Sequence, residues 1–193
     1  MKSSQPLQKV VFLDRDGVIN RDSAQYIKTW EEFDFLPNSL EALHILTSTG
    51  HPIILITNQS AINRGLTTMA HLQEIHRQMS RVIEEAGGRI LDIFFCPHKP
   101  SENCACRKPK PGMIQQAREK HNIDLAASIF IGDSEKDILC ARAAGCGQSI
   151  LVLTGNGPSS MQQLEKKGIG PDYLAKDLLE ATRWILDPTR KSG

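Results

Sequence analysis

The stretch Val10-Val11-Phe12-Leu13-Asp14-Arg15-Asp16-Gly17 decides the fold that this sequence predicts. It begins with four apolar residues in a row, which is typical of a strand buried on both faces of a parallel sheet. Two carboxylates and a glycine follow almost at once. We therefore expect a buried strand over residues 10–13 and a charged turn at its carboxyl end.

Four more apolar runs are strand candidates of the same kind. They cover residues 53–56, 90–95, 129–131 and 150–153. Between and after them, apolar residues recur with helical spacing, and the first such segment opens with a capping-box pattern of Asn38 and Glu41. Helices are expected over residues 38–46, 72–86, 112–120, 134–144, 159–167 and 177–186. Alternating strands and helices predict an α/β protein with a mainly parallel sheet.

Length and composition limit the class of protein. The chain has 193 residues, with 23 Lys and Arg against 22 Asp and Glu and a net charge of +1. This length fits a single domain over residues 1–193, and the charge shows no basic field for nucleic acid. No apolar run approaches the roughly 20 residues of a membrane helix, and no secretory signal is readable. We expect a cytoplasmic monomer with no membrane and no nucleic-acid partner.

Polar residues follow four of the strand candidates at the point where each strand ends. They stand at residues 14–17, 57–60, 96–98 and 132–133. In open α/β sheets, ligands bind at the carboxyl ends of the strands. These four segments are therefore where a functional site is expected.

Asp14 and Asp16 are the first candidates for chemistry. An Asp-x-Asp-Gly segment is most often an Asx-type turn or a helix cap. Two carboxylates within one turn repel each other, however, and a cation between them relieves that repulsion. Asp133 could supply a third oxygen ligand. Asp137 completes a capping box with Ser134, which is the role that we expect for it, although it could also orient the site.

Three of the five cysteines crowd together with a histidine between residues 96 and 106. A set of three thiolates and one imidazole suits a structural, tetrahedral Zn²⁺ with no open position. Reduced cysteines beside an exposed histidine are the alternative, and a redox centre is a further one, although no Cys-x-x-Cys occurs. We expect a zinc-binding loop whose ligands are Cys96, His98, Cys104 and Cys106.

Four motifs occur in the order found in the haloacid-dehalogenase-like phosphatases, and the chain resembles that family from residue 10 to about residue 153. The motifs are Val-Val-Phe-Leu-Asp-Arg-Asp-Gly-Val (residues 10–18), Ile-Leu-Ile-Thr-Asn-Gln (54–59), Arg-Lys-Pro (107–109) and Ile-Gly-Asp-Ser-Glu-Lys-Asp (131–137). The resemblance implies a Rossmann-like three-layer sandwich that is cap-less, with the zinc-binding loop added to it.

The resemblance also implies a reaction and the residues that perform it. Asp14 would attack phosphorus and form an aspartyl-phosphate, and Asp16 would be the general acid and base. Mg²⁺ would be held by Asp14, Asp133 and the backbone carbonyl of Asp16. Thr57 would hydrogen-bond a phosphoryl oxygen, and Lys108 would offset negative charge.

Within the family, the Cys-Pro-His and Cys-x-Cys-Arg-Lys-Pro segments are similar to small members that act on D-glycero-D-manno-heptose 1,7-bisphosphate or on histidinol phosphate. The segment Lys-Pro-Lys-Pro-Gly-Met (108–113) resembles the members that act on the heptose substrate. This resemblance implies that the enzyme removes the 7-phosphate, a step in the synthesis of nucleotide-activated heptose for the lipopolysaccharide core. The residues expected to bind this small phosphorylated sugar are Asp22, Tyr26, Asn58, Gln59, Ser60, Arg107 and Ser134.

Two other classes of function remain as alternatives. A scaffold that has lost catalysis would be a zinc-stapled binding protein, but a pure binder needs no such set of acidic and basic residues. A nucleic-acid end phosphatase is disfavoured by the net charge of +1 and by only two Trp and two Tyr for stacking. Away from the motifs, we expect Arg64 to be a solvated loop charge and residues 155–157 to form a simple turn.

Overall fold

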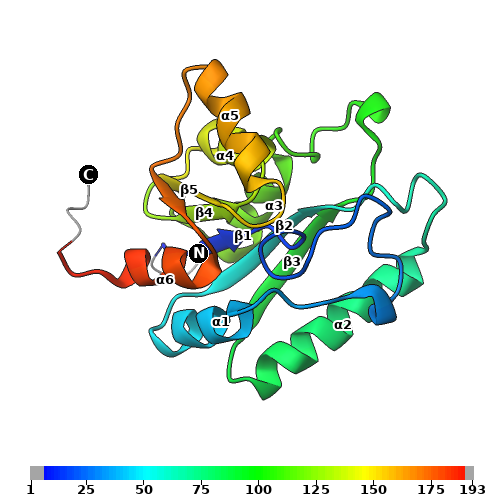
Figure 1. The fold of residues 1–193 in the computed structure, drawn as a ribbon, viewed down its shortest axis with the longest axis horizontal. Helices are drawn as coiled ribbons and strands as arrows, with labels where there is room; N and C mark the ends of the chain where they lie inside the picture. The colour runs from blue at the N-terminus through cyan, green and yellow to red at the C-terminus, as the bar shows by residue number, and fades with distance from the viewer. Residues whose placement is uncertain (1–6, 190–193) are drawn as a thin grey trace, which may run out of the picture.

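The computed structural model describes residues 7–189, and its centre is a six-stranded sheet (Figure 1). The strands are β1 Val11–Leu13, β2 Ile53–Asn58, β3 Ile90–Cys96, β4 Ile129–Gly132, β5 Gln148–Val152 and β6 Tyr173–Ala175. They lie in the order β3-β2-β1-β4-β5-β6, and every neighbouring pair is parallel. The α/β fold and the Rossmann-like order are thus confirmed.

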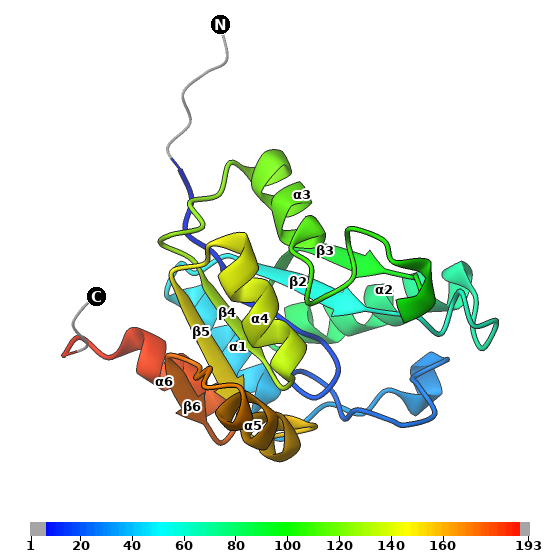
Figure 2. The same cartoon turned by 90° about the horizontal axis from the view of Figure 1, so that it is seen from above.

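Helices cover both faces of this sheet, which gives three layers (Figures 1 and 2). Side chains of α1, α2 and α6 pack on one face of the sheet, and those of α3, α4 and α5 pack on the other. Two short 3-10 helices, η1 and η2, lie in connecting loops. The bounds are α1 Ser39–Ser48, α2 Met69–Glu85, α3 Gly112–His121, α4 Glu135–Ala144, α5 Gly157–Lys166, α6 Leu178–Leu186, η1 Trp30–Glu32 and η2 Pro100–Glu102.

The central strand β1 explains why its sequence is apolar without a break. Leu13 packs in the core on the α1 side, whereas its neighbour Phe12 packs in the core on the α3 side. Both side chains are fully buried. Because alternate side chains enter two different cores, a strand in this position has no polar face.

Strand β3 differs from the expectation of burial on both faces. It forms one edge of the sheet, and most of its side chains are only half-buried, with Leu91 36% exposed. The strand β6 at the opposite edge is not predicted by the sequence, because three residues are too few to show a period. An apolar run alone therefore does not distinguish an edge strand from a central one.

The capping box expected at the start of α1 is wrong. Asn38 lies in the left-handed region at φ 66°, and its side chain makes no capping hydrogen bond. Its Nδ2 instead donates to Asp177 Oδ2 at 3.2 Å, which links the starts of α1 and α6. A long-range partner has here displaced the local capping interaction.

The strand order places the site. The chain leaves β3 at one edge and returns on the other side of β1 as β4, so β1 and β4 are neighbours whose connections run in opposite directions. A crevice forms at such a point, beyond the carboxyl ends of the strands. Among the described helices, none is both long and apolar enough to cross a bilayer.

Candidate active site

The side chain of Lys108 lies between two carboxylates at the centre of the site. Its Nζ is 2.9 Å from Asp14 Oδ2 and 2.6 Å from Asp137 Oδ1. Asp14 is the first residue after β1, and its N–H donates to the carbonyl of Ile131 in β4. Burial opposes the charge on Lys108, but the carboxylates of Asp137 and Asp14 outweigh burial and raise its pKa. The lysine is therefore charged at neutral pH.

Three buried carboxyl groups lie together here, and two of them, Asp14 and Asp137, contact this ammonium ion. One oxygen each of Asp14, Asp133 and Asp137 lies within 4.8 Å of the others. Burial raises the pKa of Asp14 to about 7 against the opposing effect of Lys108, and burial, Asp137 and Asp14 raise the pKa of Asp133 to about 8. When all three are ionised, two negative charges remain in excess. Oxygen donors with this charge suit a divalent cation.

Asp137 and Asp133 are each fixed by hydrogen bonds. Asp137 Oδ2 accepts from the backbone N–H of Ser134 at 3.0 Å and from its hydroxyl at 2.8 Å, so the expected capping box at α4 is confirmed. Its other oxygen is the one that faces Lys108. Asp133 Oδ2 accepts from the backbone N–H of Asn156 at 2.7 Å and from its Nδ2 at 3.1 Å. Asp137 thus both caps a helix and positions the central lysine.

Asp16 has a different set of donors from Asp14. Arg15 Nη2 lies 2.7 and 3.0 Å from its two carboxylate oxygens. Asn20 Nδ2 and Gln59 Nε2 donate to the same carboxylate from 2.9 and 2.8 Å. Burial opposes ionisation of Asp16, but Arg15 and these hydrogen bonds lower its pKa. Two carboxyl groups in one turn therefore have pKa values displaced in opposite directions, because different groups surround them.

A cavity of about 430 Å³ opens beside Asp14, a volume that suits a small phosphorylated molecule. All the residues that the sequence assigns to catalysis, to Mg²⁺ or to substrate border it, whereas the zinc candidates do not. The bordering residues so assigned are Asp14, Asp16, Asp22, Tyr26, Thr57, Asn58, Gln59, Ser60, Arg107, Lys108, Asp133 and Ser134.

The residues after β2 connect the parts of the site. Gln59 Nε2 donates to Thr57 Oγ1 at 2.9 Å as well as to Asp16, which leaves the hydroxyl proton of Thr57 for another acceptor. Asn58 pairs with the backbone of Lys108. Its Oδ1 accepts from the lysine N–H at 3.1 Å, and its Nδ2 donates to the lysine carbonyl at 3.3 Å. Asn58 therefore fixes the segment that carries the central ammonium group.

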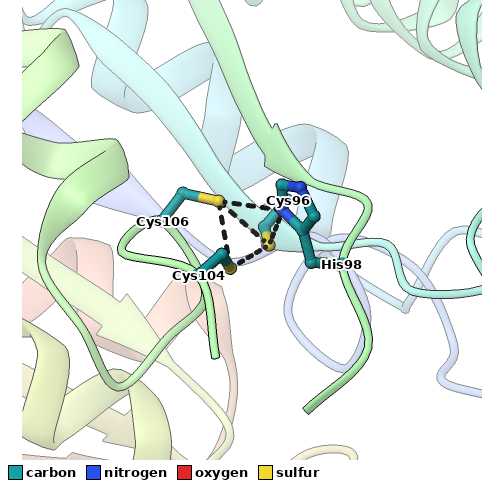
Figure 3. A group of neighbouring side chains, drawn as sticks. All are labelled: Cys96, His98, Cys104 and Cys106. Atoms are coloured by element: carbon teal, nitrogen blue, oxygen red, sulfur yellow. Dashed lines mark hydrogen bonds between the residues drawn. The ribbon is translucent and has the colours of Figure 1, made fainter. Parts of the chain in front are cut away.

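The four members of the Cys/His cluster converge from the end of β3, which carries Cys96, and from the loop that follows it (Figure 3). Cys106 Sγ is 3.2 Å from Cys96 Sγ, 3.4 Å from Cys104 Sγ and 3.3 Å from His98 Nδ1. These separations are close to the edges of a tetrahedron around an ion with ligands at about 2.0–2.3 Å. Arg107 follows directly, and its Nη1 donates to the His98 carbonyl at 3.1 Å. The backbone of the cluster thus positions the guanidinium of Arg107, which borders the cavity.

Other residues of the site are not predicted by the sequence. Arg64 is exposed, as expected, but it also borders the cavity, with its guanidinium 5.8 Å from the ring centroid of Tyr26. Residues 155–156 lie at a turn, as expected, whereas Gly157 already begins α5, and Asn156 also borders the cavity and holds Asp133. Their roles depend on distant partners, and no local pattern reveals them.

The fully buried guanidinium of Arg15 is a third feature that the sequence does not predict. Its Nη1 is 3.4 Å from Nε2 of His76 in α2, and its Cζ is 5.9 Å from the ring centroid of Phe33. Burial and the charge of Arg15 lower the pKa of His76 to about 3, so the imidazole is neutral and can accept a hydrogen bond. The position of Arg15 between Asp14 and Asp16, directly after a buried strand, is the signal that could have revealed it.

In the absence of divalent cations, we expect the contribution of Asp133 to the unfolding free energy to fall as the pH rises from 6.5 to 8. Its pKa is raised to about 8, so the folded state keeps a proton that the unfolded state has already lost. Relative to Asp133→Asn, the wild type should lose about 1–2 kcal/mol of unfolding free energy over this range, measured by urea denaturation. Comparison with the variant removes the contributions of other titrating groups. A difference that stays constant or reverses contradicts the assignment.

Comparison with known proteins places the chain in a family. Residues 105–181 match a family model described as HAD-hydrolase-like. A D-glycero-beta-D-manno-heptose-1,7-bisphosphate 7-phosphatase of Pseudomonas aeruginosa is 45% identical over 150 residues, which are 78% of this chain and 84% of that protein. A D-glycero-alpha-D-manno-heptose-1,7-bisphosphate 7-phosphatase of Photorhabdus laumondii is 42% identical over 158 residues, 78% of this chain and 86% of that protein.

A solved structure agrees with the sequence relatives. The crystal structure of D,D-heptose 1,7-bisphosphate phosphatase from B. bronchiseptica, complexed with magnesium and phosphate, is 40% identical with a TM-score of 0.87. The match covers 93% of this chain and 98% of that chain. The chain therefore belongs to the haloacid-dehalogenase-like phosphatases, among the relatives of the heptose-bisphosphate phosphatases, and it is a phosphomonoester hydrolase.

Proposed function

We propose that this enzyme removes the 7-phosphate of D-glycero-D-manno-heptose 1,7-bisphosphate with the help of Mg²⁺. The observation that carries the proposal is the buried group of Asp14, Asp133 and Lys108 at the wall of a cavity sized for a small phosphorylated molecule. The names of the relatives support the choice of substrate. The product would enter the synthesis of nucleotide-activated heptose for the lipopolysaccharide core.

The reaction proceeds in two displacements at phosphorus. A carboxylate oxygen of Asp14 attacks the 7-phosphate, a bond forms between that oxygen and phosphorus, and the bond from phosphorus to the sugar oxygen breaks. Asp16 gives its proton to the departing sugar oxygen. Water then attacks the aspartyl-phosphate, Asp16 takes the proton of that water, and inorganic phosphate leaves with the Asp14 carboxylate regenerated.

The surroundings of Asp16 favour the ionised form that the second displacement needs. The first displacement needs the protonated form, which a bound phosphate would favour. The lowered pKa of Asp16 keeps it ionised, which is the form that accepts a proton from water. For the first displacement it must hold a proton, and the negative charge of a bound phosphate raises a neighbouring carboxyl pKa. The proton is then retained until the sugar oxygen begins to leave.

Mg²⁺ fits the carboxylate group on charge and donor type. Asp14, Asp133 and the backbone carbonyl of Asp16 would hold it, because oxygen ligands are the ones that Mg²⁺ prefers and the ionised group carries two unbalanced negative charges. When bound, the ion lowers the repulsion between an anionic nucleophile and an anionic phosphate. Thr57, through its free hydroxyl proton, and Lys108, through its charge, would stabilise the phosphoryl oxygens.

Zn²⁺ fits the Cys/His cluster equally well, and its role is structural. Cys96, His98, Cys104 and Cys106 supply four soft donors and leave no position for water. A zinc ion there would hold the loop that carries Arg107. The planar guanidinium of Arg107 suits a second phosphate or sugar hydroxyls. Because the loop would already be held in place, less entropy would be lost when the substrate binds.

The remaining assignments complete the proposal. Asp22, Tyr26, Gln59, Ser60 and Ser134 would contact the sugar, and Asn58 would act by holding Lys108 in place. Residues 1–193 would form a single domain that works as a cytoplasmic monomer. The net charge of +1 gives no support for a nucleic-acid partner.

We expect Asp14→Asn to lower kcat by at least about 1,000-fold, because an amide is not a nucleophile for phosphorus. The measurement is phosphate release with Mg²⁺ from both anomers of heptose 1,7-bisphosphate. Asp34→Asn is the matched control, since Asp34 is exposed, pairs with Arg21 on the surface and does not border the cavity. Turnover that survives Asp14→Asn contradicts the mechanism.

The substrate itself is tested with a panel of phosphates on the wild type. Beside the two heptose anomers, it contains fructose 1,6-bisphosphate, histidinol phosphate and a 5′-phosphorylated oligonucleotide. A heptose bisphosphate should lead in kcat/KM by about 100-fold or more. A higher kcat/KM with histidinol phosphate leaves the chemistry intact and assigns the enzyme to histidine biosynthesis instead.

We expect about one zinc ion per chain, and its loss in Cys106→Ser. KM for the bisphosphate should then rise more than kcat falls, because Arg107 loses its support while Asp14 and Lys108 keep their contacts. The measurements are metal analysis of the purified protein and steady-state kinetics. Cys146→Ser is the control, since this free thiol lies outside the cluster. A wild type without zinc, or a variant with unchanged kinetics, contradicts the assignment.

A further inference from the structure

The turn between β5 and α5 contacts two carboxylates that border the cavity, Asp133 and Asp22. We propose that its Asn156 is a positioning residue, which joins the metal-binding carboxylate of Asp133 to the substrate-side loop at Asp22. The inference rests on the proposed function, because it assumes that Asp133 binds Mg²⁺. It is carried by three hydrogen bonds from one residue to two carboxylates.

The first part of the junction is the contact with Asp133. Both donors of Asn156, its backbone N–H at 2.7 Å and its Nδ2 at 3.1 Å, point to the same oxygen, Oδ2. Oδ1 of Asp133 is thereby left for a cation. Groups that orient a ligand in this way are worth about 10–100-fold in metal affinity in other proteins.

The second part is the contact with Asp22. The same Nδ2 donates to Asp22 Oδ2 at 2.8 Å, so a single amide group lies between two carboxylates. An amide donates to both, whereas an oxygen at this position would repel both. Asp22 lies in the loop that also carries Tyr26, and both residues border the cavity. Whatever orders Asp133 therefore also restrains the loop that faces the sugar.

The turn is held firmly against the strand ends. Thr154 Oγ1 donates to the carbonyl of Gly17 at 2.6 Å, directly after the catalytic turn. Gly155 lies at φ 54°, and a Cβ there would overlap Asp133 Oδ2 and lie 2.7 Å from the Gly17 Cα. No side chain can be added at position 155 without displacing one of these groups. The backbone donor of Asn156 thus has a fixed place relative to Asp133.

Two variants and one control separate the side chain from the backbone. Asn156→Ala removes Nδ2 and keeps the backbone N–H, and Asn156→Asp keeps the shape but turns a donor into an acceptor. Ser159→Ala is the control, because the Ser159 hydroxyl donates to the Asn156 carbonyl at 2.9 Å rather than to Asp133 or Asp22. Melting temperatures in the absence of Mg²⁺ establish that each variant is folded.

The decisive readout is Mg²⁺ affinity by calorimetry on the protein without substrate. We expect the dissociation constant for Mg²⁺ to rise about 10-fold in Asn156→Ala and further in Asn156→Asp, with Ser159→Ala unchanged. At saturating Mg²⁺, KM should rise about 3–10-fold in Asn156→Ala while kcat stays within about 2-fold. Wild-type affinity in both Asn156 variants overturns the inference and leaves the proposed function standing. A wild type that binds no Mg²⁺ overturns the metal part of the proposed function as well.

A double-mutant cycle tests the junction with the loop. In an Asp22→Ala background, Asn156→Ala should no longer raise KM further, because the contact between the two side chains is already lost. It should still weaken Mg²⁺ binding, since the contact with Asp133 is independent of Asp22. Fully additive effects on KM contradict the role of Asn156 as a junction.

Discussion

The ion pair network of Lys108 with Asp14 and Asp137 is the interaction on which the rest of the site depends. An ammonium ion with 2% exposure is stable only beside buried carboxylates, and Asp14 and Asp137 provide them at 2.9 and 2.6 Å. With Asp133 added, the group holds more negative than positive charge. Burial, together with the neighbouring carboxylates, raises the pKa values of Asp14 and Asp133, and a divalent cation would offset the negative charge of this group.

The sheet topology makes this network possible. Asp14 and Asp133 follow the neighbouring strands β1 and β4, and Asp137 lies in the first turn of the helix after β4. Lys108 comes from the loop after β3, at the far edge of the sheet, and Asn58 holds it at the centre by binding its backbone. A lysine that no strand carries is thereby brought to carboxylates that follow β1 and β4.

The sequence predicts those parts of the structure that leave a local pattern. Asp14 and Asp133 could be placed because an apolar run ends directly before a polar segment, and the Ser134 and Asp137 capping box spans only four residues. The edge position of β3, the short strand β6 and the second role of Asn156 could not be predicted. They depend on which distant groups come into contact, and Asn38 shows how such a contact displaces a local capping preference. The strand order followed from the family resemblance, since the apolar runs do not encode it.

The measurement that tests this account most directly counts the protons released when Mg²⁺ binds at pH 7. Calorimetric titrations of the Mg²⁺-free protein in buffers with different ionisation enthalpies give this number. With pKa values of about 7 for Asp14 and about 8 for Asp133, we expect release of about 1–2 protons per ion bound. Binding without proton release would contradict it, because the buried carboxyl groups would then be ionised before any cation arrives.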